Sequence, residues 1–449
     1  MALTQRVKHR ALSATARSLL RIAARTSDRN LLRLTHVLQT VLPRIDFYQS
    51  GLATLGRMFE EGHQGLAAAR RILTEPSRAA VARLINNLIV GNLVEGYQRR
   101  YAFWEQHGIA PPAALLLSPT MRCNLACEGC YAARYSRDEE LSRETVQRLI
   151  AEARALGINF ITFLGGEPFL WPHLVDVIED HPEVAFQVFT SGLHLDEPLI
   201  GRLAATANVL VVLGIEGWRE TTEQRRGPGS FDRALGLMDL LRRRGLLVAY
   251  STTVTRHNVE EVTDPQFVRL LIDHGAHLGW YFHYQPTGAC PNMDALPTPE
   301  QRGAMRDRLR HIRRTMPILI VDFLNDGALV DGCMSAGRRY LHINHRGDVE
   351  PCIFVHYAAD NIHEKSLGEA LRSEFFRALR ARQPFHPNHL RCCMILDNPQ
   401  YLREAVAQHR PRPTHPDADA FLTRFAPQID DYAKAYGALA DQAQQSGRQ

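Results

Sequence analysis

The stretch that decides the fold reads Cys123-Asn124-Leu125-Ala126-Cys127-Glu128-Gly129-Cys130. Its three cysteines have the spacing CxxxCxxC. Thiolates select soft metals and iron–sulfur clusters, and three ligands on a [4Fe–4S] cube leave the fourth iron open. Three structural thiols and a zinc site are the alternatives, although structural zinc takes four closed ligands and this segment holds no fourth Cys or His. The spacing therefore favours a cluster with one iron free for chemistry.

The composition is that of an ordinary globular protein. The chain has 449 residues, 45% apolar and 22% charged, which is long enough for two or three domains. Eight cysteines are too few and too unevenly placed for a disulfide scaffold, and no signal peptide opens the sequence. An uninterrupted apolar run of about 18 residues, which a transmembrane helix needs, is missing. We therefore expect a cytoplasmic protein with reduced thiols.

The formal net charge of +5 is concentrated at the start of the chain. Residues 1–27 carry six Lys or Arg and no Asp or Glu, and the apolar residues Leu19, Leu20, Ile22 and Ala23 lie between the arginines. This pattern predicts a basic amphipathic helix. A solvated helix face, a disordered start and a transit peptide are alternatives to contact with anionic lipid headgroups or with an acidic electron-transfer partner.

Helical periodicity continues to about residue 105. Gly65 to Arg100 has helical character, and His107 to Pro112 resembles a linker. The sequence thereby divides into a helical domain, a linker, a β-α domain, a cysteine-containing extension and a helical tail. The expected bounds are 1–106, 107–112, 113–296, 297–410 and 411–449.

After the linker, short apolar runs alternate with helical segments, which predicts a parallel sheet with right-handed crossovers. Residues typical of helix ends support this interpretation. Ser142 precedes a predicted helix that ends at Gly157, and Ser230 precedes a predicted helix over Phe231–Arg244. Ligands of such sheets bind at the carboxyl ends of the strands. The predicted strands are Ala113–Leu117, Asn159–Leu164, Ala185–Thr190, Val209–Gly214, Leu247–Val254 and Leu278–Tyr284.

The unusual residues follow these strands directly. The cysteine triplet follows the first strand, and Gly165-Gly166-Glu167-Pro168 follows the second. Two glycines let the backbone approach a ligand closely, and the carboxylate can accept hydrogen bonds from an ammonium group, although a simple tight turn is an equal alternative. Thr190-Ser191-Gly192 and Glu216-Gly217 end the next two strands. Their hydroxyl and carboxylate groups could hold a ribose.

In combination, these motifs resemble the radical S-adenosylmethionine (SAM) enzymes over roughly residues 113–290. The resemblance implies an α/β fold: a partial (βα)6 TIM-like barrel, here with an all-helical N-terminal domain and a small α+β cysteine-containing C-terminal extension. In that family the open iron chelates the amino and carboxylate groups of SAM. The reduced cluster then cleaves SAM to a 5′-deoxyadenosyl radical, which abstracts hydrogen from the substrate.

The resemblance assigns residues to roles. Cys123, Cys127 and Cys130 hold the cluster, and the turn of Gly165, Gly166, Glu167 and Pro168 meets the methionine amino group. Further SAM contacts, to the ribose or carboxylate, are Thr190, Ser191 and Glu216. One departure stands out, because the family often has an aromatic residue just before the third cysteine. This chain has Gly129 there, followed by Tyr131.

The remaining cysteines imply a second cluster. The segment that ends in Gly347-Asp348-Val349-Glu350-Pro351-Cys352 is similar to the SPASM or shortened "twitch" extension of radical SAM enzymes, which carries an auxiliary iron–sulfur cluster. The expected ligands are Cys333, Cys352 and Cys393, with Cys392 as a fourth ligand or a spectator. Buried free thiols and a zinc site are the alternatives.

Other residues near the expected barrel mouth have weaker roles. Cys290 and Tyr284 are candidate substrate or catalytic contacts, and His283 is a candidate substrate contact, although core packing also explains the two rings. The aromatic run Trp280–Tyr284 fits a strand that packs on helices outside and lines a cavity inside. Arg225 and Arg226 could bind an anionic group, or they could simply be solvated.

The substrate does not follow from the motifs. The architecture is similar to that of the molybdenum cofactor biosynthesis enzyme, but the C-terminal Gly-Gly tail of that enzyme is absent. A peptide, a lipid or a small metabolite remains open, with no nucleic acid expected. A flavodoxin or ferredoxin would donate electrons, and the protein would be cytoplasmic or peripheral at an anionic membrane. An iron–sulfur protein that relays electrons without SAM is the alternative function.

Overall fold

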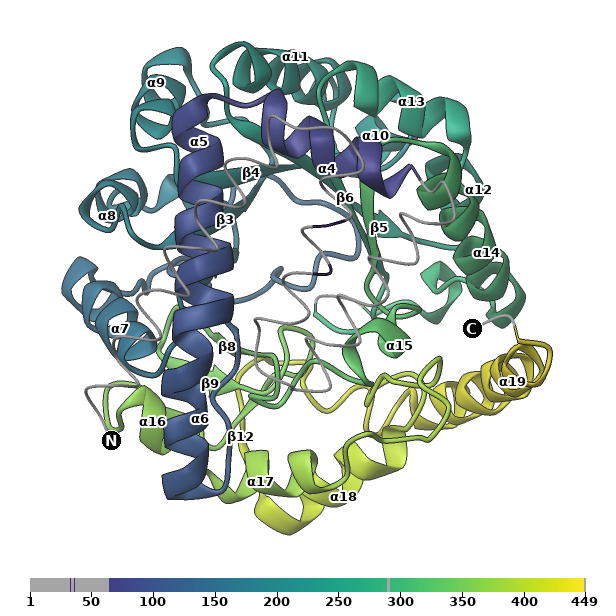
Figure 1. Cartoon of the computed structure of the whole chain (residues 1–449). Coiled ribbons are helices and arrows are strands. Elements are labelled where there is room, and N and C mark those ends of the chain that lie inside the picture. Colours follow the sequence, from purple (N-terminus) through teal and green to yellow (C-terminus); the bar gives the residue numbers. More distant parts are fainter. Residues whose placement is uncertain (1–32, 34–35, 37–63, 289–290, 448–449) are drawn as a thin grey trace.

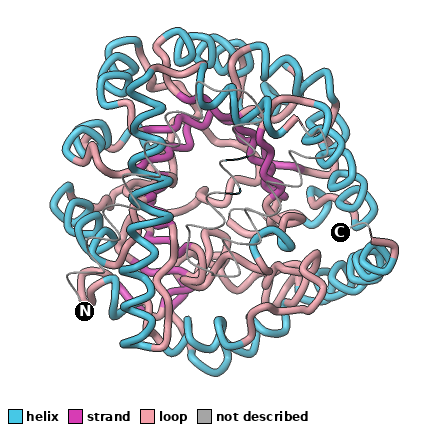
Figure 2. The backbone as a smooth tube through the Cα atoms, viewed as in Figure 1, coloured by secondary structure: helices cyan, strands magenta, loops and turns pink. Residues whose placement is uncertain are grey.

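The computed structural model describes residues 33, 36, 64–288 and 291–447. Its centre is a ten-stranded sheet with the order β11-β9-β8-β1-β2-β3-β4-β5-β6-β7. Figures 1 and 2 show this sheet as a curved inner layer with helices around its outer side. The architecture is the expected open α/β barrel.

All six predicted strands are present, and each bound agrees within one residue. Neighbouring strands pair in parallel throughout this series, as the β-α alternation predicts. The strands are β1 (Ala114–Leu117), β2 (Phe160–Phe163), β3 (Ala185–Thr190), β4 (Val209–Gly214), β5 (Leu247–Val254) and β6 (Leu278–His283).

Two further parallel strands extend the barrel at its two edges. β7 (Leu319–Asp322) pairs with β6, and β8 (Tyr340–Ile343) pairs with β1. The extension from β8 onward turns back on itself, because β8 pairs with β9 (Asp348–Glu350) in antiparallel fashion, as β9 does with β11 (Asp360–Asn361). The cysteine-containing extension is therefore joined to the barrel directly beside β1, the strand that precedes the cysteine triplet.

The outer helices bury their apolar sides against the sheet. Ser142 caps α7 as predicted, since its hydroxyl accepts a hydrogen bond from Thr145 N at 3.2 Å. Ser230 does not cap its helix: it is the first helical residue, and it donates its hydroxyl to Gly227 O. The barrel helices are α7 (Arg143–Ala155), α8 (Leu174–Asp180), α9 (Glu197–Thr206), α10 (Arg219–Arg226), α11 (Ser230–Arg243), α12 (Val259–Val262), α13 (Pro265–Asp273) and α14 (Pro299–Thr315).

The described part of the N-terminal domain is helical, as expected. A π-helix of 12 residues joins two α-helices into one long rod, which crosses the barrel in Figure 1. The elements are α4 (Gly65–Thr74), α5 (Arg78–Arg83), the π-helix η1 (Leu84–Glu95) and α6 (Gly96–His107). The basic amphipathic helix expected in residues 1–27 lies outside the described residues.

This helical layer caps the amino ends of the strands. Asn92 Nδ2 donates to Ala113 O just before β1, and Asn87 Nδ2 donates to Val184 O just before β3, both at 3.0 Å. Arg71 donates to Ala276 O and Pro317 O before β6 and β7, at 2.9 Å each. The amino end of the barrel is thus covered by protein, and the carboxyl ends lie on the opposite side.

The C-terminal third consists of short strands and helices beside the barrel. The helices are α15 (Gly327–Val330), α16 (Leu367–Ala370), α17 (Glu374–Ala381), α18 (Pro399–His409) and α19 (Ala426–Gln445). A separate two-stranded sheet pairs β10 (Tyr357–Ala358) with β12 (Arg412–Pro413), so the predicted helical tail begins with a strand. Among the residues that the structure describes, no helix is both long and apolar enough to cross a bilayer.

Candidate functional site

The cysteine triplet lies in the loop that follows β1, at the carboxyl end of the barrel. Cys123, Cys127 and Cys130 are free, partly exposed thiols. The backbone turns between them, because Cys130 N donates to Cys127 O at 3.3 Å, and Leu125 N donates to Cys123 Sγ at 3.4 Å. The loop thus presents three thiols from one short segment.

The surroundings of these thiols influence their ionisation. Burial raises the pKa of Cys123, and the nearby Glu167 and the other two cysteines raise it further. Burial also raises the pKa of Cys130, while Arg225 and Arg226 lower it. The raised pKa of Cys123 and Cys130 favours their protonated thiols, and a metal that binds these two must displace their protons.

The Gly165–Pro168 turn packs directly on this loop. Gly166 N donates to Thr120 O at 3.1 Å, and Glu167 N donates to Arg122 O at 2.7 Å. Gly165 has a φ of +117°, and a Cβ on either glycine would overlap the backbone of residues 120–122. The two glycines are required by the contact with the cysteine loop, whereas the sequence suggested either close approach to a ligand or a tight turn.

Glu167 connects the Gly165–Pro168 turn to the end of β3. Its side chain is 1% exposed. One carboxylate oxygen accepts a hydrogen bond from Thr190 Oγ1 at 2.6 Å, and the other accepts bonds from Ser191 N at 2.8 Å and Ser191 Oγ at 2.7 Å. The structure brings the predicted residues of the second and third strands together, and it places Thr190 and Ser191 as donors that orient Glu167.

Glu216 lies at the end of the fourth strand in a buried charge cluster. Its carboxylate accepts hydrogen bonds from Arg225 at 2.6 Å, from Arg226 at 2.8 Å and from Thr253 N at 2.8 Å. Burial would raise the pKa of Glu216, but the two arginines outweigh it and hold that pKa below its ordinary value. Arg225 and Arg226 are therefore not merely solvated.

The same arginines reach the cysteine loop. Arg225 Nε donates to Glu128 O at 3.1 Å, and the guanidinium of Arg226 occupies the space that a side chain at Gly214 would fill. Two guanidinium groups face the Glu216 carboxylate, and the Glu167 carboxylate also lies near the thiols. The arginines can therefore pair with an anionic group of a ligand at the cysteine loop.

Tyr284 packs against the loop from the end of β6. The ring is 2% exposed, and a Cβ on Gly129 would overlap it. Gly129 also has a φ of +66°. An aromatic ring thus lies beside the third cysteine although residue 129 has no side chain. Cys290 lies outside the described residues.

The aromatic run on β6 divides between two faces, as predicted. Tyr281 points outward and donates its hydroxyl to Val262 O at 2.9 Å. Trp280 and Phe282 are partly exposed and lie with Phe189 of β3, at ring-centroid distances of 6.1 and 5.7 Å. His283 pairs with the buried Asp322 at 2.8 Å, so core pairing accounts for His283.

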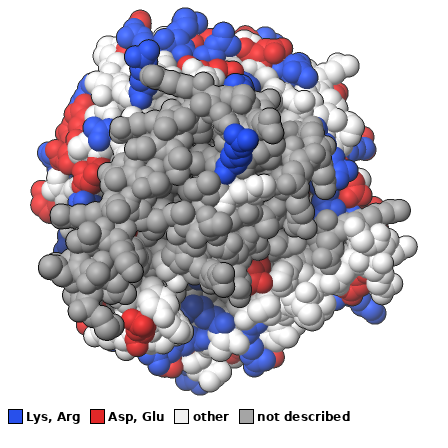
Figure 3. Space-filling view, viewed as in Figure 1, with Lys and Arg blue, Asp and Glu red and all other residues white. Residues whose placement is uncertain are grey.

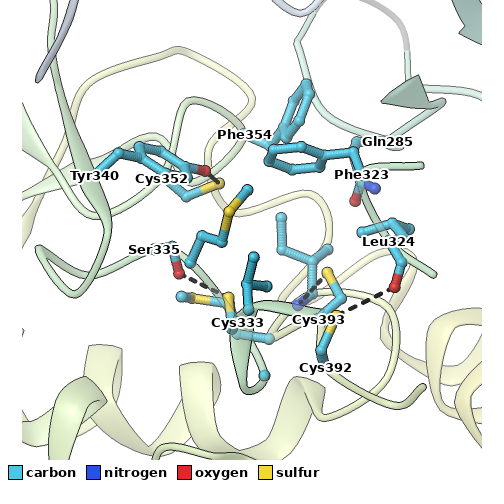
Figure 4. Close-up of a pocket in the computed structure, with 15 residues that line it drawn as sticks. Gln285, Phe323, Leu324, Cys333, Ser335, Tyr340, Cys352, Phe354, Cys392 and Cys393 are labelled. Atoms are coloured by element: carbon cyan, nitrogen blue, oxygen red, sulfur yellow. Dashed lines mark hydrogen bonds between the residues drawn. The ribbon is translucent and has the colours of Figure 1, made fainter. Parts of the chain in front are cut away.

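A second group of cysteines lines one cavity in the extension. Figure 4 shows Cys333, Cys352, Cys392 and Cys393 around it. Cys352 hydrogen bonds to the Tyr340 hydroxyl at 3.0 Å. Burial raises the pKa of all four thiols, that of Cys352 to about 12. Cys392 and Cys393, which are adjacent in the sequence, thus line the same cavity as Cys333 and Cys352.

The two cysteine sites lie close to one another. Tyr131, next to Cys130, meets Phe354 edge to face at a centroid distance of 5.6 Å, and Phe354 lines the cavity of the second group. The structure thus places one aromatic contact between a neighbour of the first site and the wall of the second. Sequence reasoning missed this link, since residues 131 and 354 are far apart in the chain.

A buried hydrogen-bond chain runs beside this contact. Ser118 Oγ, at the end of β1, lies 2.7 Å from His342 Nε2, and His342 Nδ1 lies 2.6 Å from Glu350. Glu350 also accepts a hydrogen bond from Thr414, which bonds to the Tyr135 hydroxyl. The motif Gly-Asp-Val-Glu-Pro-Cys predicted a role for Cys352. It did not predict that Glu350 connects through His342 to Ser118 at the end of β1.

A single metal ion does not fit these thiols as they stand. In the described ranges, no three or more His, Cys, Asp or Glu side chains are grouped to hold one ion. A cubane cluster binds each thiolate at a different iron. The donor set of two cysteine groups, with a glycine-lined approach at the first, is suited to clusters.

Comparison with known proteins supports the binding of iron–sulfur clusters by the two cysteine groups. The model of the radical SAM superfamily matches residues 117–271, and that of an iron–sulfur cluster-binding domain, SPASM, matches residues 333–394. Both cysteine groups fall inside or at the bounds of these matches.

Curated relatives include a maturase and a peptide cyclase. The mycofactocin maturase MftC of Mycobacterium tuberculosis is 30% identical over 315 residues, which is 66% of this chain and 77% of the relative. The PqqA peptide cyclase of Xanthomonas axonopodis pv. citri is 28% identical over 289 residues, 58% of this chain and 74% of the relative.

Solved structures share the fold. Streptococcus suis SuiB bound to the precursor peptide SuiA has a TM-score of 0.55 at 17% identity, covering 64% of this chain and 71% of that one. The protein anSMEcpe with bound AdoMet has a TM-score of 0.51 at 15% identity, covering 72% and 99%. The chain therefore belongs to the radical SAM superfamily with a SPASM domain, and its cofactors are a [4Fe–4S] cluster with SAM and an auxiliary iron–sulfur cluster.

Proposed function

We propose that this protein is a radical SAM enzyme that modifies a peptide. The observation that carries the radical SAM chemistry is the convergence of the cysteine loop, Glu167 and the Arg225–Glu216 pair at the carboxyl end of the barrel. When bound, the cluster and SAM supply a 5′-deoxyadenosyl radical that abstracts hydrogen from a substrate. The residues of the chain bind, orient and shield these groups.

Cys123, Cys127 and Cys130 are the proposed ligands of the first cluster. Their support is their position in one loop that two glycines and Tyr284 hold in place. The Gly165–Pro168 turn is bonded to residues 120–122, so the backbone of this turn would face a ligand of a cluster held by the three thiols. The turn and the cysteine loop are thus joined by hydrogen bonds.

The charges at this rim suit the amino-acid part of SAM. The carbonyls of the Gly165–Pro168 turn can accept hydrogen bonds from an ammonium group, while Arg225 or Arg226 can pair with a carboxylate. The Glu167 carboxylate already accepts four hydrogen bonds within the protein, so it positions this turn. Thr190 and Ser191 hold Glu167 in place. Since Glu216 already accepts three hydrogen bonds, we assign it to positioning the arginines, and the ribose contact to other groups of the rim.

All four thiols of the second cavity are proposed ligands of the auxiliary cluster. Cys392 lies in the same cavity as Cys333, Cys352 and Cys393, which raises it from a spectator to a ligand. Four thiolates would close this cluster against substrate, in contrast with the open first site. Its proposed role is electron exchange beside the substrate, with a flavodoxin or ferredoxin as the external donor.

A peptide is the proposed substrate class. The relatives MftC and PqqA peptide cyclase are named for the maturation of mycofactocin and for the cyclisation of PqqA, and SuiB was solved with a precursor peptide. The partly exposed wall of Trp280, Phe282 and Phe189 offers apolar contacts inside the barrel. Apolar or aromatic side chains would suit this wall.

The test is anaerobic reconstitution followed by dithionite and SAM. We expect 5′-deoxyadenosine from the intact protein and none from Cys123→Ala. A SAM-independent electron carrier would give no 5′-deoxyadenosine from either. Cys352→Ala should lose the auxiliary cluster but keep the first one. The iron content should therefore fall from near eight atoms per chain to near four, while SAM cleavage continues.

The peptide assignment has its own assay. Short peptides encoded beside the gene are incubated with the reduced enzyme and SAM, and their masses are measured. We expect a mass change that needs SAM and is absent with Cys123→Ala. Robust 5′-deoxyadenosine formation without a change in any such peptide would contradict the substrate class while leaving the radical chemistry intact.

A further inference from the structure

The helix α6 exposes a strip of aromatic side chains. Tyr101 is 43% exposed and Trp104 is 46% exposed. Their ring centroids lie 5.4 Å apart, and Tyr97 continues the strip at 6.0 Å from Tyr101. Positions 97, 101 and 104 fall on one side of the helix. Exposed aromatic residues in contact with one another mark an interaction surface more often than single scattered ones do.

A different side of α6 holds the helix on the protein. Arg100 is buried and donates to Gly157 O and Asn92 O. Phe103 lies against Gly368 of α16 and contacts the ring of His107 at 4.3 Å. The aromatic strip is therefore not needed to attach α6, and its exposure calls for a partner outside the described fold.

The charge of the chain is unevenly divided in a way that suits an anionic partner. Residues 1–107 hold 16 Lys or Arg against 7 Asp or Glu, whereas the rest of the chain holds 37 against 41. Figure 3 shows basic and acidic side chains interspersed around the described rim of the face it presents. Most of the excess belongs to residues 1–63, with 10 basic against 4 acidic side chains.

We propose that the helical domain docks on an anionic lipid bilayer through Tyr101 and Trp104. Tyr and Trp place an apolar ring and a polar tip at the headgroup level, and clustered Lys and Arg add attraction to anionic lipids. Neither interaction alone gives stable binding, but this chain carries both, with the rings on α6 and most of the excess basic residues in the preceding sequence 1–63. A bilayer suits both the rings and the broad positive charge, which a small ligand would not use.

The position of α6 explains how docking is compatible with catalysis. The helical layer caps the amino ends of the strands, whereas the cysteine loop and Glu167 lie at the carboxyl ends. Attachment through α6 therefore leaves the reaction site accessible. Because the docking surface and the reaction site lie at opposite ends of the barrel, we infer that the membrane is where the enzyme is located and that a lipid is not its substrate. The docking proposal does not depend on whether the substrate is a peptide.

The test is co-sedimentation of the full chain with vesicles of phosphatidylcholine alone or mixed with phosphatidylglycerol. We expect binding to the anionic vesicles that weakens as salt is raised. Tyr101→Ser/Trp104→Ser should weaken it by about tenfold or more, while Leu329→Ser, which changes an equally exposed residue on α15, should not. Equal melting temperatures would show that all three proteins are folded.

A second readout locates the contact. Brominated lipids in the anionic vesicles should quench part of the tryptophan fluorescence, and Trp104→Phe should lose that part. Three results would overturn the proposal: no vesicle binding, equal binding to neutral and anionic vesicles, or anionic binding that Tyr101→Ser/Trp104→Ser does not change. A lipid-free dimer that this double substitution dissociates, together with no vesicle binding, would assign the strip to a second copy of the chain.

Discussion

Arg302 and Asp397 form a fully buried ion pair beneath the auxiliary cysteines. Two guanidinium nitrogens of Arg302 meet the two carboxylate oxygens of Asp397 at 2.6 and 3.1 Å. The Arg302 guanidinium carbon lies 3.6 Å from the centre of the Tyr436 ring of α19, and Asp397 also accepts a hydrogen bond from Cys393 N at 2.9 Å. The pair thus joins α14, α19 and the segment that contains Cys393 and Asp397.

Asp397→Ala should destabilise the protein severely, because it leaves the Arg302 charge buried and uncompensated. We expect a loss of about 3 to 5 kcal/mol in the free energy of unfolding, measured by urea denaturation. The auxiliary iron should fall as well, since the backbone N–H of Cys393 loses the Asp397 carboxylate as its acceptor. Arg302→Met/Asp397→Leu is the control, and it should cost much less. Equal losses in the two variants would show that the charge is not the cause.

Gly129→Ala should prevent assembly of the first cluster. The new methyl group would overlap the Tyr284 ring, and the φ of +66° is unfavourable for alanine. Gly108→Ala is a matched control, because Gly108 has a φ of +71° with nothing within 4 Å of its Cβ position, so it should cost only about 1 to 2 kcal/mol of backbone strain. Iron per chain and the spectrum of the reduced cluster measure the difference. If both variants lose the cluster alike, backbone strain alone is responsible.

Local patterns predicted the barrel well. The six strands agree because each is a short apolar run between turn residues, and the cysteine triplet, Glu167 and Glu216 are found at the carboxyl ends of β1, β2 and β4 because parallel strands bring those ends together. The strands β7 and β8 were missed. β8 is only four residues long and its pairing with β1 is long-range, so its own sequence carries little signal.

The supporting residues of the site were harder to predict than its ligands. Arg225 and Arg226 look like exposed loop residues in sequence, and only the fold reveals that Glu216 holds them beside the thiols. The same holds for Tyr284, which fills the space left by Gly129. Such pairs depend on which strands become neighbours, and one sequence read locally does not contain that information.

Glu167→Gln should weaken SAM binding without unfolding the protein. The amide would keep the size of the side chain, but its NH2 group would face the donors of Thr190 or Ser191 and so displace the turn whose carbonyls meet the ammonium group. Hydrogen bonds to charged groups contribute about 1.5 to 3 kcal/mol, so the dissociation constant should rise about tenfold or more. Binding is measured by the change that SAM makes in the spectrum of the reduced cluster. Ser191→Ala, which removes one supporting donor, should have a smaller effect, and an unchanged affinity in Glu167→Gln would contradict the assignment.

Acid should loosen the joint between the cysteine loop and the extension, because His356 is buried there without a charge partner. Its ring contacts Tyr135 and His415 at centroid distances of 5.5 and 5.0 Å. Burial, together with the neighbouring His415 and His342, lowers the pKa of His356 to about 3. The unfolded chain binds a proton near pH 6.5 and the folded protein does not, so stability is full above that pH and falls as the pH drops toward 3, by about 1.4 kcal/mol per pH unit. Urea denaturation between pH 7 and pH 5 should show a shallower decline for His356→Phe than for the native protein, while His257→Asn, at an exposed position, should follow the native curve. Parallel curves for His356→Phe and the native protein would mean that other groups control the acid sensitivity.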